Sequence, residues 1–350
     1  MENLSLLHKD KDLPKNLCLK IFSIASFLLV LVVAICHYLF FDPYKLPETD
    51  IANLFKQWMI EHNKNYSNDR ETYNRYVNFK YNFEHIISWN SKKINKATLE
   101  INKFADLTQE EFGQLWGGYS PKHYEHLNYV YLNDPGLPND FDWSSNNAIT
   151  PVKDQRGCAA SWVFALVGSI ESLGYLELDS LVSFSEQQVI DCAFPDRVKC
   201  HPGDVIEGFQ YIKQNGIMTE SEYPYQGAGG QCRFSKEDVE FSINNINLVP
   251  PNNMEQLKFA VGTQPVVAGI QADQFVMQFY KSGIIGTECG HQINHAVLVT
   301  GFGFHSDTLT DYWKIKNSWG RDWGLDGYAL IERSSNNACG ILSSASYPSL

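Results

Sequence analysis

The chain has 350 residues, of which 44% are hydrophobic and 19% are charged, a composition typical of a globular protein with one large or two medium domains. Forty acidic against 28 basic residues give a formal net charge of -12, which repels nucleic acid phosphates and anionic lipid headgroups. We therefore expect no nucleic acid partner. The 13% of aromatic residues suit a substantial core or a groove that grips an extended partner.

The N-terminal region combines a lysine-containing segment with an apolar run. Residues 21–41 carry no formal charge apart from a possible charge on His37, and as a helix they can span about 30 Å of hydrocarbon. Lysines within residues 1–20 favour a cytosolic N-terminus, so that this stretch is a cytosolic n-region. A signal anchor, giving a single-pass type II membrane protein, competes with a signal peptide cleaved after Cys36 and with a buried core helix. The first two interpretations place the remainder in the secretory pathway lumen or outside the cell.

The next two stretches differ in their periodicity. Residues 49–115 are polar but helically periodic and predict two or three amphipathic helices, with apolar positions at Leu54, Trp58, Ile60, Tyr73, Val77, Tyr81 and Ile86. Residues 116–136 contain Tyr119-Ser-Pro-Lys and Asn133-Asp-Pro-Gly and predict an exposed linker without a core of its own. A domain boundary near Leu137 follows.

The region from residue 137 to residue 350 changes character along its length. Apolar residues at steps of three or four predict a helix from Ser161 to Leu178. Later runs are short, β-rich and bounded by Gly or Asn, and they begin at Pro265, Ala296, Tyr312 and Tyr328. Helices followed by strands predict an α+β fold of two halves with a crevice between them.

Six of the eight cysteines lie in this last region. An even set in a loop-rich domain predicts three disulfides and an oxidising compartment, although spacing alone leaves fifteen pairings open. No CxxC pair occurs with a matching His or Cys pair, so a zinc site is not expected.

Three separated segments carry a family resemblance. They are Pro151-Val-Lys-Asp-Gln-Arg-Gly-Cys-Ala-Ala-Ser-Trp, Asn294-His-Ala-Val and Lys316-Asn-Ser-Trp-Gly. Together they resemble the active-site framework of papain-like cysteine peptidases, particularly the cathepsin L group. Further motifs follow in the family's order, namely Ser185-Glu-Gln-Gln-Val-Ile-Asp-Cys, Tyr223-Pro-Tyr, Gly320-Arg-Asp-Trp-Gly and Cys339-Gly-Ile.

The N-terminal half resembles the inhibitory propeptide of the same family. The spaced pattern falls on Glu71, Arg75, Phe79, Asn82, Ile86 and Asn90. A second motif continues at Asn102, Phe104 and Asp106, although Glu100 stands where the family usually has Gly. The resemblance implies a proform with a helical propeptide at 49–115 and a papain-like domain at 137–350, whose two lobes are helical and β-barrel-like.

The resemblance assigns a role to each active-site position. His295 is the imidazole, Asn317 orients it, and Gln155 donates a hydrogen bond to the oxyanion. Trp319 shields the pair from water. In the family, a cysteine thiolate at a helix N-terminus attacks the peptide carbonyl, and the imidazole protonates the leaving amine. Neither a cofactor nor a metal is implied.

The nucleophile position departs from the family. The family's local signature reads Cys, Gly, a small residue, Cys and then an aromatic residue. This chain reads Cys158-Ala-Ala-Ser161-Trp, so Ser161 replaces the catalytic cysteine. A serine hydroxyl ionises far above neutral pH, so it does not form a standing anion as a thiol does. In the family the catalytic His is charged in the resting enzyme, and a charged imidazole cannot accept the proton of a hydroxyl. We therefore predict strongly impaired peptidase activity.

The cysteine count agrees with this prediction. The resemblance implies three disulfide pairs, Cys158 with Cys200, Cys192 with Cys232, and Cys289 with Cys339. All six cysteines of the domain are then consumed, and no free thiol remains between residues 137 and 350.

The substrate cleft is altered but recognisable. Gly203 matches the family residue that pairs backbone to backbone with an extended peptide, and Val205 stands where the apolar second subsite begins. Pro202 removes an N–H beside Gly203, so peptide binding is expected to be weakened or redirected. Arg156 adds bulk and charge beside Gln155, where Gly is common.

Three functional hypotheses follow. The leading one is a peptide-binding pseudopeptidase, which competes for substrates, sequesters the family's inhibitors or serves as a scaffold. The alternative is an active endopeptidase that uses Ser161, His295 and Asn317. The third is an inhibitor that acts through a released propeptide.

The expected compartment is the secretory lumen, a lysosome or vacuole, or the extracellular space. Its predicted partners are an extended peptide or protein, the chain's own propeptide and, through the N-terminal segment, a membrane. Asn65-Tyr-Ser is a glycosylation acceptor sequence on the lumenal side.

Overall fold

The computed structural model describes residues 46–124, 127–196 and 200–350. The predicted apolar span at 21–41 lies outside them. The chain divides into two compact units, residues 1–54 and 55–350. The described part of the first unit holds the start of helix α2 (Glu48–Glu61), whose first turn carries Glu48 and Asp50 at the positive end of the helix dipole. Among the described residues, no helix is both long and apolar enough to cross a membrane.

Helix α3 (Asp69–Ser91) is the longest element of the second unit and begins at a capped residue, because the Asn68 side chain accepts a hydrogen bond from Glu71 N–H. Its buried face is Phe79, Asn82 and Ile86. The predicted apolar positions Tyr73, Val77 and Tyr81 are instead exposed, by 65%, 45% and 63%. That expectation was wrong because these three share a face with one another but not with Phe79.

Two further elements complete the region before residue 117. Strand β1 (Ala97–Leu99) follows α3, and helix α4 (Gln109–Trp116) begins with a capping box between Thr108 and Glu111. β1 pairs antiparallel with β7 (Tyr280–Ile285), so the propeptide region adds a strand to the sheet of the later domain.

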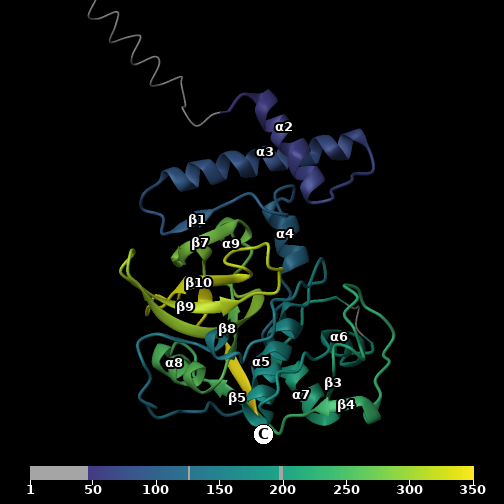
Figure 1. Ribbon diagram of the computed structural model, residues 1–350, viewed down its shortest axis with the longest axis vertical. Coiled ribbons are helices and arrows are strands. Elements are labelled where there is room, and N and C mark those ends of the chain that lie inside the picture. Colours follow the sequence, from purple (N-terminus) through teal and green to yellow (C-terminus); the bar gives the residue numbers. More distant parts are fainter. Residues whose placement is uncertain (1–45, 125–126, 197–199) are drawn as a thin grey trace, which may run out of the picture. The chain divides into compact units, whose positions relative to one another are not determined.

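The helical lobe is built on α5 (Ser161–Leu178), which has the predicted bounds. Fourteen of its residues are buried, because α5 contacts α6 (Glu186–Cys192) and α7 (Val205–Asn215) on one side and the sheet on the other. Figure 1 shows this central position of α5. A small sheet of β3 (Ile217–Met218) and β4 (Val239–Phe241) closes this lobe.

The second lobe is a sheet of order β1-β7-β10-β9-β8-β6-β11-β5, with β2 paired to β8. The predicted strands at residues 265–270, 296–300, 312–316 and 328–331 are confirmed as β6, β8, β9 and β10. Its remaining elements are β2 (Phe141–Asp142), β5 (Asn245–Val249), β6 (Val266–Ile270), β8 (His295–His305), β9 (Thr310–Lys316), β10 (Tyr328–Glu332), β11 (Ala345–Ser349), α8 (Met254–Thr263) and α9 (Phe275–Gln278). Short 3-10 turns lie at Trp143–Asn146, Lys236–Asp238, Thr287–Cys289 and Ala338–Gly340.

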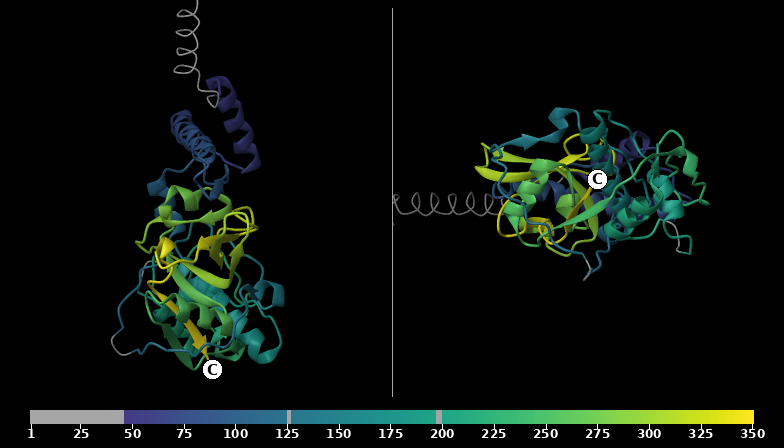
Figure 2. Two further views of the ribbon diagram at one scale, coloured as in Figure 1. Left: turned by 90° about the vertical axis from the view of Figure 1, so that its left-hand side faces the viewer. Right: turned by 90° about the horizontal axis from the view of Figure 1, so that it is seen from below.

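Three disulfides join Cys158 to Cys200, Cys192 to Cys232, and Cys289 to Cys339. The first two lie in the helical lobe and the third in the sheet lobe. The α+β fold of two lobes is thus confirmed, and Figure 2 shows the curved strands and the α5 region from two further directions.

Candidate active site

Ser161 and His295 are the first residues of two elements that pack against each other. Ser161 begins α5, and His295 begins β8, where it pairs with Ile270 of β6. Both residues are fully buried. The Trp162 ring packs behind Ser161 and against Gly203, where a Cβ would lie 2.4 Å from a ring atom.

The hydroxyl of Ser161 is not bonded to His295. Ser161 Oγ accepts a hydrogen bond from Ala296 N–H at 3.2 Å. No hydrogen bond of standard geometry reaches His295 Nδ1 within the described residues, although the backbone carbonyls of Trp116 and Gly117 lie close enough to the ring to raise its pKa. The bond between nucleophile and base that defines a catalytic pair is therefore not formed in this proform.

Asn317 fixes the orientation and tautomer of the imidazole. Its Oδ1 accepts from Ser318 N–H at 2.8 Å and lies 2.7 Å from His295 Nε2. Because Oδ1 is an acceptor, Nε2 carries the proton and Nδ1 presents the lone pair. The orienting role that the resemblance implies for Asn317 is compatible with this geometry.

The protonation state of His295 differs from the expectation. Burial lowers the pKa of His295 to about 4, and Asn317 together with the backbone carbonyls of Trp116 and Gly117 only partly opposes that effect. The imidazole is therefore neutral at neutral pH. The expectation of a charged resting His was wrong for this chain, because burial outweighs the hydrogen bonds that favour the charged ring.

Gln155 is buried and its amide is aimed at the propeptide. Ser318 Oγ donates to Gln155 Oε1 at 2.7 Å, which turns Nε2 towards the carbonyls of Gly117 at 3.1 Å and Cys158 at 3.0 Å. Trp319 Nε1 donates to the Trp116 carbonyl at 3.0 Å. The donor predicted for the oxyanion thus binds two backbone carbonyls, one in the linker and one three residues after Gln155.

The segment after Trp116 lies in the cleft as an extended strand. Gly203 N–H donates to the Gly118 carbonyl at 3.1 Å, and the Gly203 carbonyl accepts from Ser120 N–H at 2.9 Å. Tyr119 and Gly203 form a parallel bridge. The prediction of a wholly exposed linker was therefore wrong for this segment, because its backbone pairs with the catalytic domain.

Gly118 is required by this close approach. Its φ is +127°, and a Cβ there would lie 2.4 Å from the Ala159 backbone. Tyr119 next to it is 7% exposed, and its hydroxyl lies 2.8 Å from Ser344 Oγ. Its ring belongs to the same buried cluster as Val205, the first residue of α7.

Trp319 covers the imidazole on the propeptide side. Its ring centroid lies 4.8 Å from that of His295 and 5.0 Å from that of Phe112 in α4. Trp319 is fully buried. The ring therefore keeps solvent from the His295 and Asn317 pair, which stabilises the neutral imidazole.

Two substitutions at the edge of the cleft have local partners. Arg156 has a φ of +54°, and its guanidinium donates to the Gln226 carbonyl at 3.3 Å and lies over the Tyr225 ring. Pro202 precedes Gly203, whose N–H and carbonyl both remain available for pairing. The altered residues therefore leave the backbone edge at Gly203 in use.

The propeptide motif residues lie on α3 and fix the segment that follows it. Arg75 Nη1 donates to the Glu111 carboxylate at 2.7 Å and to the Asp106 carbonyl at 3.1 Å. Of the other motif residues, Phe79 and Ile86 are buried. The Asn82 amide donates to the carbonyls of Ala105 and Leu107, and the Asn90 amide donates to that of Leu99. The Glu71 carboxylate accepts a hydrogen bond from the Ser67 hydroxyl.

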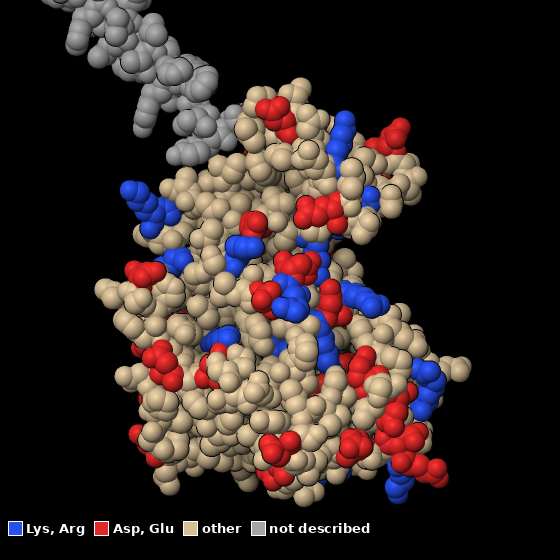
Figure 3. Space-filling view, viewed as in Figure 1, with Lys and Arg blue, Asp and Glu red and all other residues tan. Residues whose placement is uncertain are grey.

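Polar contacts attach this folded propeptide to the catalytic domain. Lys103 Nζ lies 2.7 Å from the Asp154 carboxylate and 3.2 Å from that of Asp322. The buried Asn102 amide donates to the Gln278 carbonyl at 2.7 Å. Figure 3 shows acidic and basic side chains intermingled on one face of the molecule.

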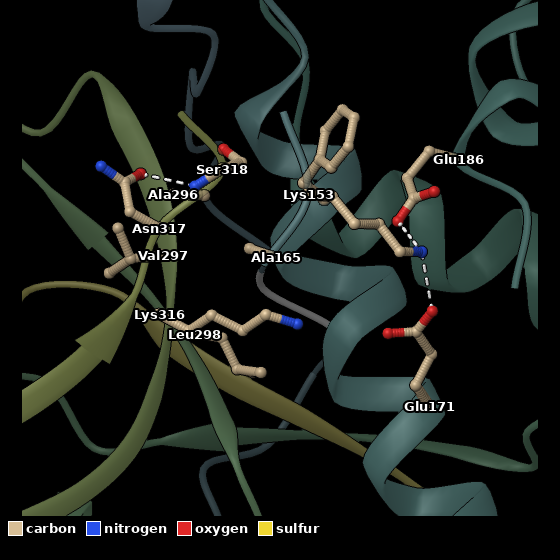
Figure 4. Close-up of a pocket in the computed structure, with 11 residues that line it drawn as sticks. Lys153, Ala165, Glu171, Glu186, Ala296, Val297, Leu298, Lys316, Asn317 and Ser318 are labelled. Atoms are coloured by element: carbon tan, nitrogen blue, oxygen red, sulfur yellow. Dashed lines mark hydrogen bonds and ion pairs between the residues drawn. The ribbon is translucent and has the colours of Figure 1, made fainter. Parts of the chain in front are cut away.

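A buried ion cluster behind the site was missed by sequence reasoning. Lys153 Nζ lies 2.8 Å from the Glu171 carboxylate and 2.6 Å from that of Glu186, and Lys316 Nζ donates to Thr150 Oγ1. A cavity of about 20 Å³, room for about one water molecule, lies beside this cluster. Figure 4 shows Lys153, Glu171, Glu186 and Lys316 among the residues that line it. Lys316 comes from the sheet lobe and the carboxylates from the helical lobe, so the cluster joins the lobes.

The charges of this cluster are strongly perturbed. Burial raises the pKa of Glu186 to about 7, and burial lowers the pKa of Lys316 to about 8. Burial alone would raise the pKa of Glu171, but the charges of Lys153 and Lys316 bring that pKa below its ordinary value. Across the part of the chain that the structure describes, no three His, Cys, Asp or Glu side chains are grouped to hold a metal ion.

The segment at Trp116–Tyr119 and the buried ion cluster leave only short sequence patterns. Trp116-Gly-Gly-Tyr119 places two glycines between aromatic residues, a pattern typical of close backbone approach, but it precedes a Pro and therefore was interpreted as linker. Glu171 stands alone in a mostly apolar helix, which indicates burial but not its partners, whereas Glu186 lies in the polar run Ser185-Glu-Gln-Gln, which gives no sign of burial.

Comparisons with known proteins agree with this geometry. A papain family cysteine protease model matches residues 137–349, and a cathepsin propeptide inhibitor domain (I29) model matches residues 55–112. A KDEL-tailed cysteine endopeptidase of Arabidopsis thaliana is 35% identical over 345 residues, covering 94% of each chain. Fruit bromelain of Ananas comosus is 34% identical over 312 residues, covering 87% of this chain and 88% of that relative.

Solved structures of proforms are also similar. A recombinant stem bromelain precursor has a TM-score of 0.79 and 35% identity, covering 86% of this chain and 99% of its own. Digestive procathepsin L 3 of Tenebrio molitor larval midgut has a TM-score of 0.78 and 34% identity, covering 86% and 99%. The chain therefore belongs to the papain family of cysteine proteases and carries a cathepsin-type inhibitory propeptide.

Proposed function

We propose that this chain is a catalytically impaired member of the papain family that is made as a proform and binds extended peptides. The observation that carries the proposal is the state of Ser161, whose Oγ accepts a hydrogen bond from Ala296 N–H and makes none with His295. A hydroxyl that is neither ionised nor bonded to a base is a weak nucleophile. The six cysteines of the domain are paired, so no described thiol replaces it.

The peptide-binding part of the proposal rests on Gly203. Its N–H pairs with the Gly118 carbonyl and its carbonyl pairs with Ser120 N–H. The backbone at Gly203 can therefore form the hydrogen bonds that would hold a peptide ligand, despite Pro202. Gly203, Val205 and Trp319 are the proposed ligand-binding residues. A peptide, a family inhibitor or a substrate of an active relative would occupy this edge after the propeptide leaves.

One observation favours the alternative, an active endopeptidase with Ser161 as nucleophile. The neutral His295 can accept a proton at Nδ1, which a charged imidazole cannot. A rotation that brings Ser161 Oγ–H towards Nδ1 would create the pair that this structure lacks. Asn317 and Gln155 would then orient the base and stabilise the oxyanion.

The proposed organisation has a propeptide at 49–115, a linker at 116–136 and a peptidase-like domain at 137–350. An anchor or signal peptide at 21–41 would deliver the chain to the secretory pathway, where the three disulfides form. Removal of the propeptide then needs another protease, because the proposed impairment prevents self-cleavage.

Binding and turnover measured together test the proposal. The proform is processed by an added cysteine protease, which is then inactivated with a thiol-alkylating agent, and a fluorogenic peptide is titrated. We expect saturable binding without product release. Product release that disappears in His295→Ala would show that the alternative is correct, and absence of binding in a folded, processed chain would refute the peptide-binding function.

A further inference from the structure

The triplet Asn65-Tyr66-Ser67 lies in the connection between α2 and α3 and alternates in exposure. Lys64 and Tyr66 are half-buried, whereas Asn65 and Ser67 are exposed. Lys64 Nζ and the Tyr66 hydroxyl both bind the Asp106 carboxylate, at 2.9 and 3.0 Å. These two anchors hold the residues on either side of Asn65 against the fold, and Asn65 itself is exposed.

The Asn65 side chain is available for chemistry. Among the residues that the structure describes, its amide makes no hydrogen bond, and no helix or strand includes it. Ser67, at the second position after it, is held in place because its N–H and hydroxyl bind the Glu71 carboxylate. A bulky group on Asn65 would therefore displace none of the contacts that hold this connection.

The sequence contains two triplets of the form Asn-x-Ser or Asn-x-Thr, at Asn3 and Asn65. They lie on opposite sides of the apolar run at 21–41. The three disulfides of the catalytic domain indicate that the portion after this run matures in an oxidising compartment, which is also where such triplets are glycosylated.

We propose that Asn65 carries an N-linked oligosaccharide, transferred from a lipid-linked oligosaccharide donor. The Asn65 amide nitrogen forms a bond with the anomeric carbon of the first sugar and loses one proton to the medium. The bond between that carbon and the lipid diphosphate breaks, and its electron pair leaves with the diphosphate. No electron is transferred, and the donor is the one co-reactant.

This position has a consequence for maturation. Residues 137–350 contain no triplet of this form, so the sugar belongs to the propeptide and leaves with it. The oligosaccharide therefore distinguishes the proform from the processed domain. It also reports membrane topology, because Asn3 and Asn65 cannot both face the lumen if the run at 21–41 spans a membrane once.

The complete chain, expressed in eukaryotic cells that glycosylate secretory proteins, provides the test. Its electrophoretic mobility is compared with and without a peptide-N-glycosidase, alongside Asn65→Gln, Ser67→Ala, Ser67→Thr and Asn3→Gln. We expect one discrete shift on deglycosylation in the unmodified chain, in Ser67→Thr and in Asn3→Gln. Asn65→Gln and Ser67→Ala should migrate as the deglycosylated chain.

Two results would overturn the proposal. One is an unmodified chain that does not shift although a secreted glycoprotein from the same cells does. The other is a shift that persists in Asn65→Gln and disappears in Asn3→Gln. Ser67→Ala leaves Asn65 in place but destroys the acceptor triplet. If Ser67→Ala and Asn65→Gln migrate alike, loss of the acceptor triplet, and not misfolding of one variant, explains the missing shift. Intact-mass analysis of the chain checks the presence of the oligosaccharide independently.

Discussion

The Ser161 hydroxyl is bound to the backbone N–H of Ala296, at 3.2 Å, and not to the imidazole of the residue before it. Burial makes the neutral form of His295 the favoured one, although Asn317 and the backbone carbonyls of Trp116 and Gly117 raise its pKa in part.

Gly118→Ala should loosen the propeptide in the cleft. The added Cβ would lie 2.4 Å from the Ala159 backbone, and the φ of +127° is unfavourable for alanine. We expect a cost of about 1–3 kcal/mol, seen as a rise of about 5- to 150-fold in the affinity of the proform for a peptide that competes for the cleft.

Gly136→Ala is the matched control, because it lies in the same linker and a Cβ there meets no atom within 4 Å. Its positive φ of +74° adds local strain without a clash in the cleft. Equal effects of the two substitutions on peptide affinity would contradict the assigned role of Gly118.

His295 should make the fold sensitive to acid. Its pKa of about 4 in the folded chain lies below the ordinary value of 6.5, so the folded state binds this proton more weakly than the unfolded state does. The resulting stability is fully present above pH 6.5 and is lost as the pH falls through 4. It amounts to about 3 kcal/mol.

Urea unfolding of the unmodified chain and of His295→Gln between pH 7 and pH 4 measures this contribution. The difference in unfolding free energy should shrink as the pH falls, because Gln does not titrate. A pH-independent difference would show that His295 is not buried as a neutral ring.

Glu186 should act in the opposite sense. Its pKa is raised by burial to about 7, so its contribution is fully present below pH 4.5 and is lost as the pH rises through 7. The Glu186→Gln side chain resembles the protonated acid and can still accept from Lys153. We expect its unfolding free energy to improve relative to the unmodified chain between pH 4.5 and pH 8.

The exposed pair of Lys281 and Glu100 provides the control for Glu186, since both side chains are more than half exposed and 2.6 Å apart. Glu100→Gln should show little pH-dependent change in stability, because surface pairs are worth about 0–1 kcal/mol. If Glu186→Gln behaves like Glu100→Gln, the charge assignment of the buried cluster is incorrect.

The motifs predicted those parts of the site whose residues lie within the motifs themselves. His295 with Asn317, Gln155 near the helix start and the disulfide partners all sit in long motifs, so their proximity could be expected from the resemblance alone. The strands of the second lobe were also predictable, because β-branched runs bounded by Gly or Asn leave few alternatives.

The missed features depend on contacts between distant segments. The pairing of Tyr119 with Gly203 joins backbones 84 residues apart, and main-chain hydrogen bonds leave no trace in side-chain pattern. The exposure of Tyr73 and the neutrality of His295 were also misjudged, because a helix's buried face and a buried group's pKa depend on what packs against them.

The central claim is that the Ser161 hydroxyl cannot do the work of a thiolate in an otherwise intact site. A Ser161→Cys proform would restore the thiol, and it can also process the unmodified proform in trans before alkylation silences it. Alkylation spares the processed domain of the unmodified chain, because its six cysteines between residues 137 and 350 are paired.

The decisive measurement is kcat/KM on one fluorogenic peptide for the processed, alkylated unmodified chain and for freshly processed Ser161→Cys. We expect a value for Ser161→Cys at least about 10³-fold higher, in line with the cost of losing a nucleophile from an assembled site. Comparable values for the two proteins, abolished in both by His295→Ala, would contradict this expectation.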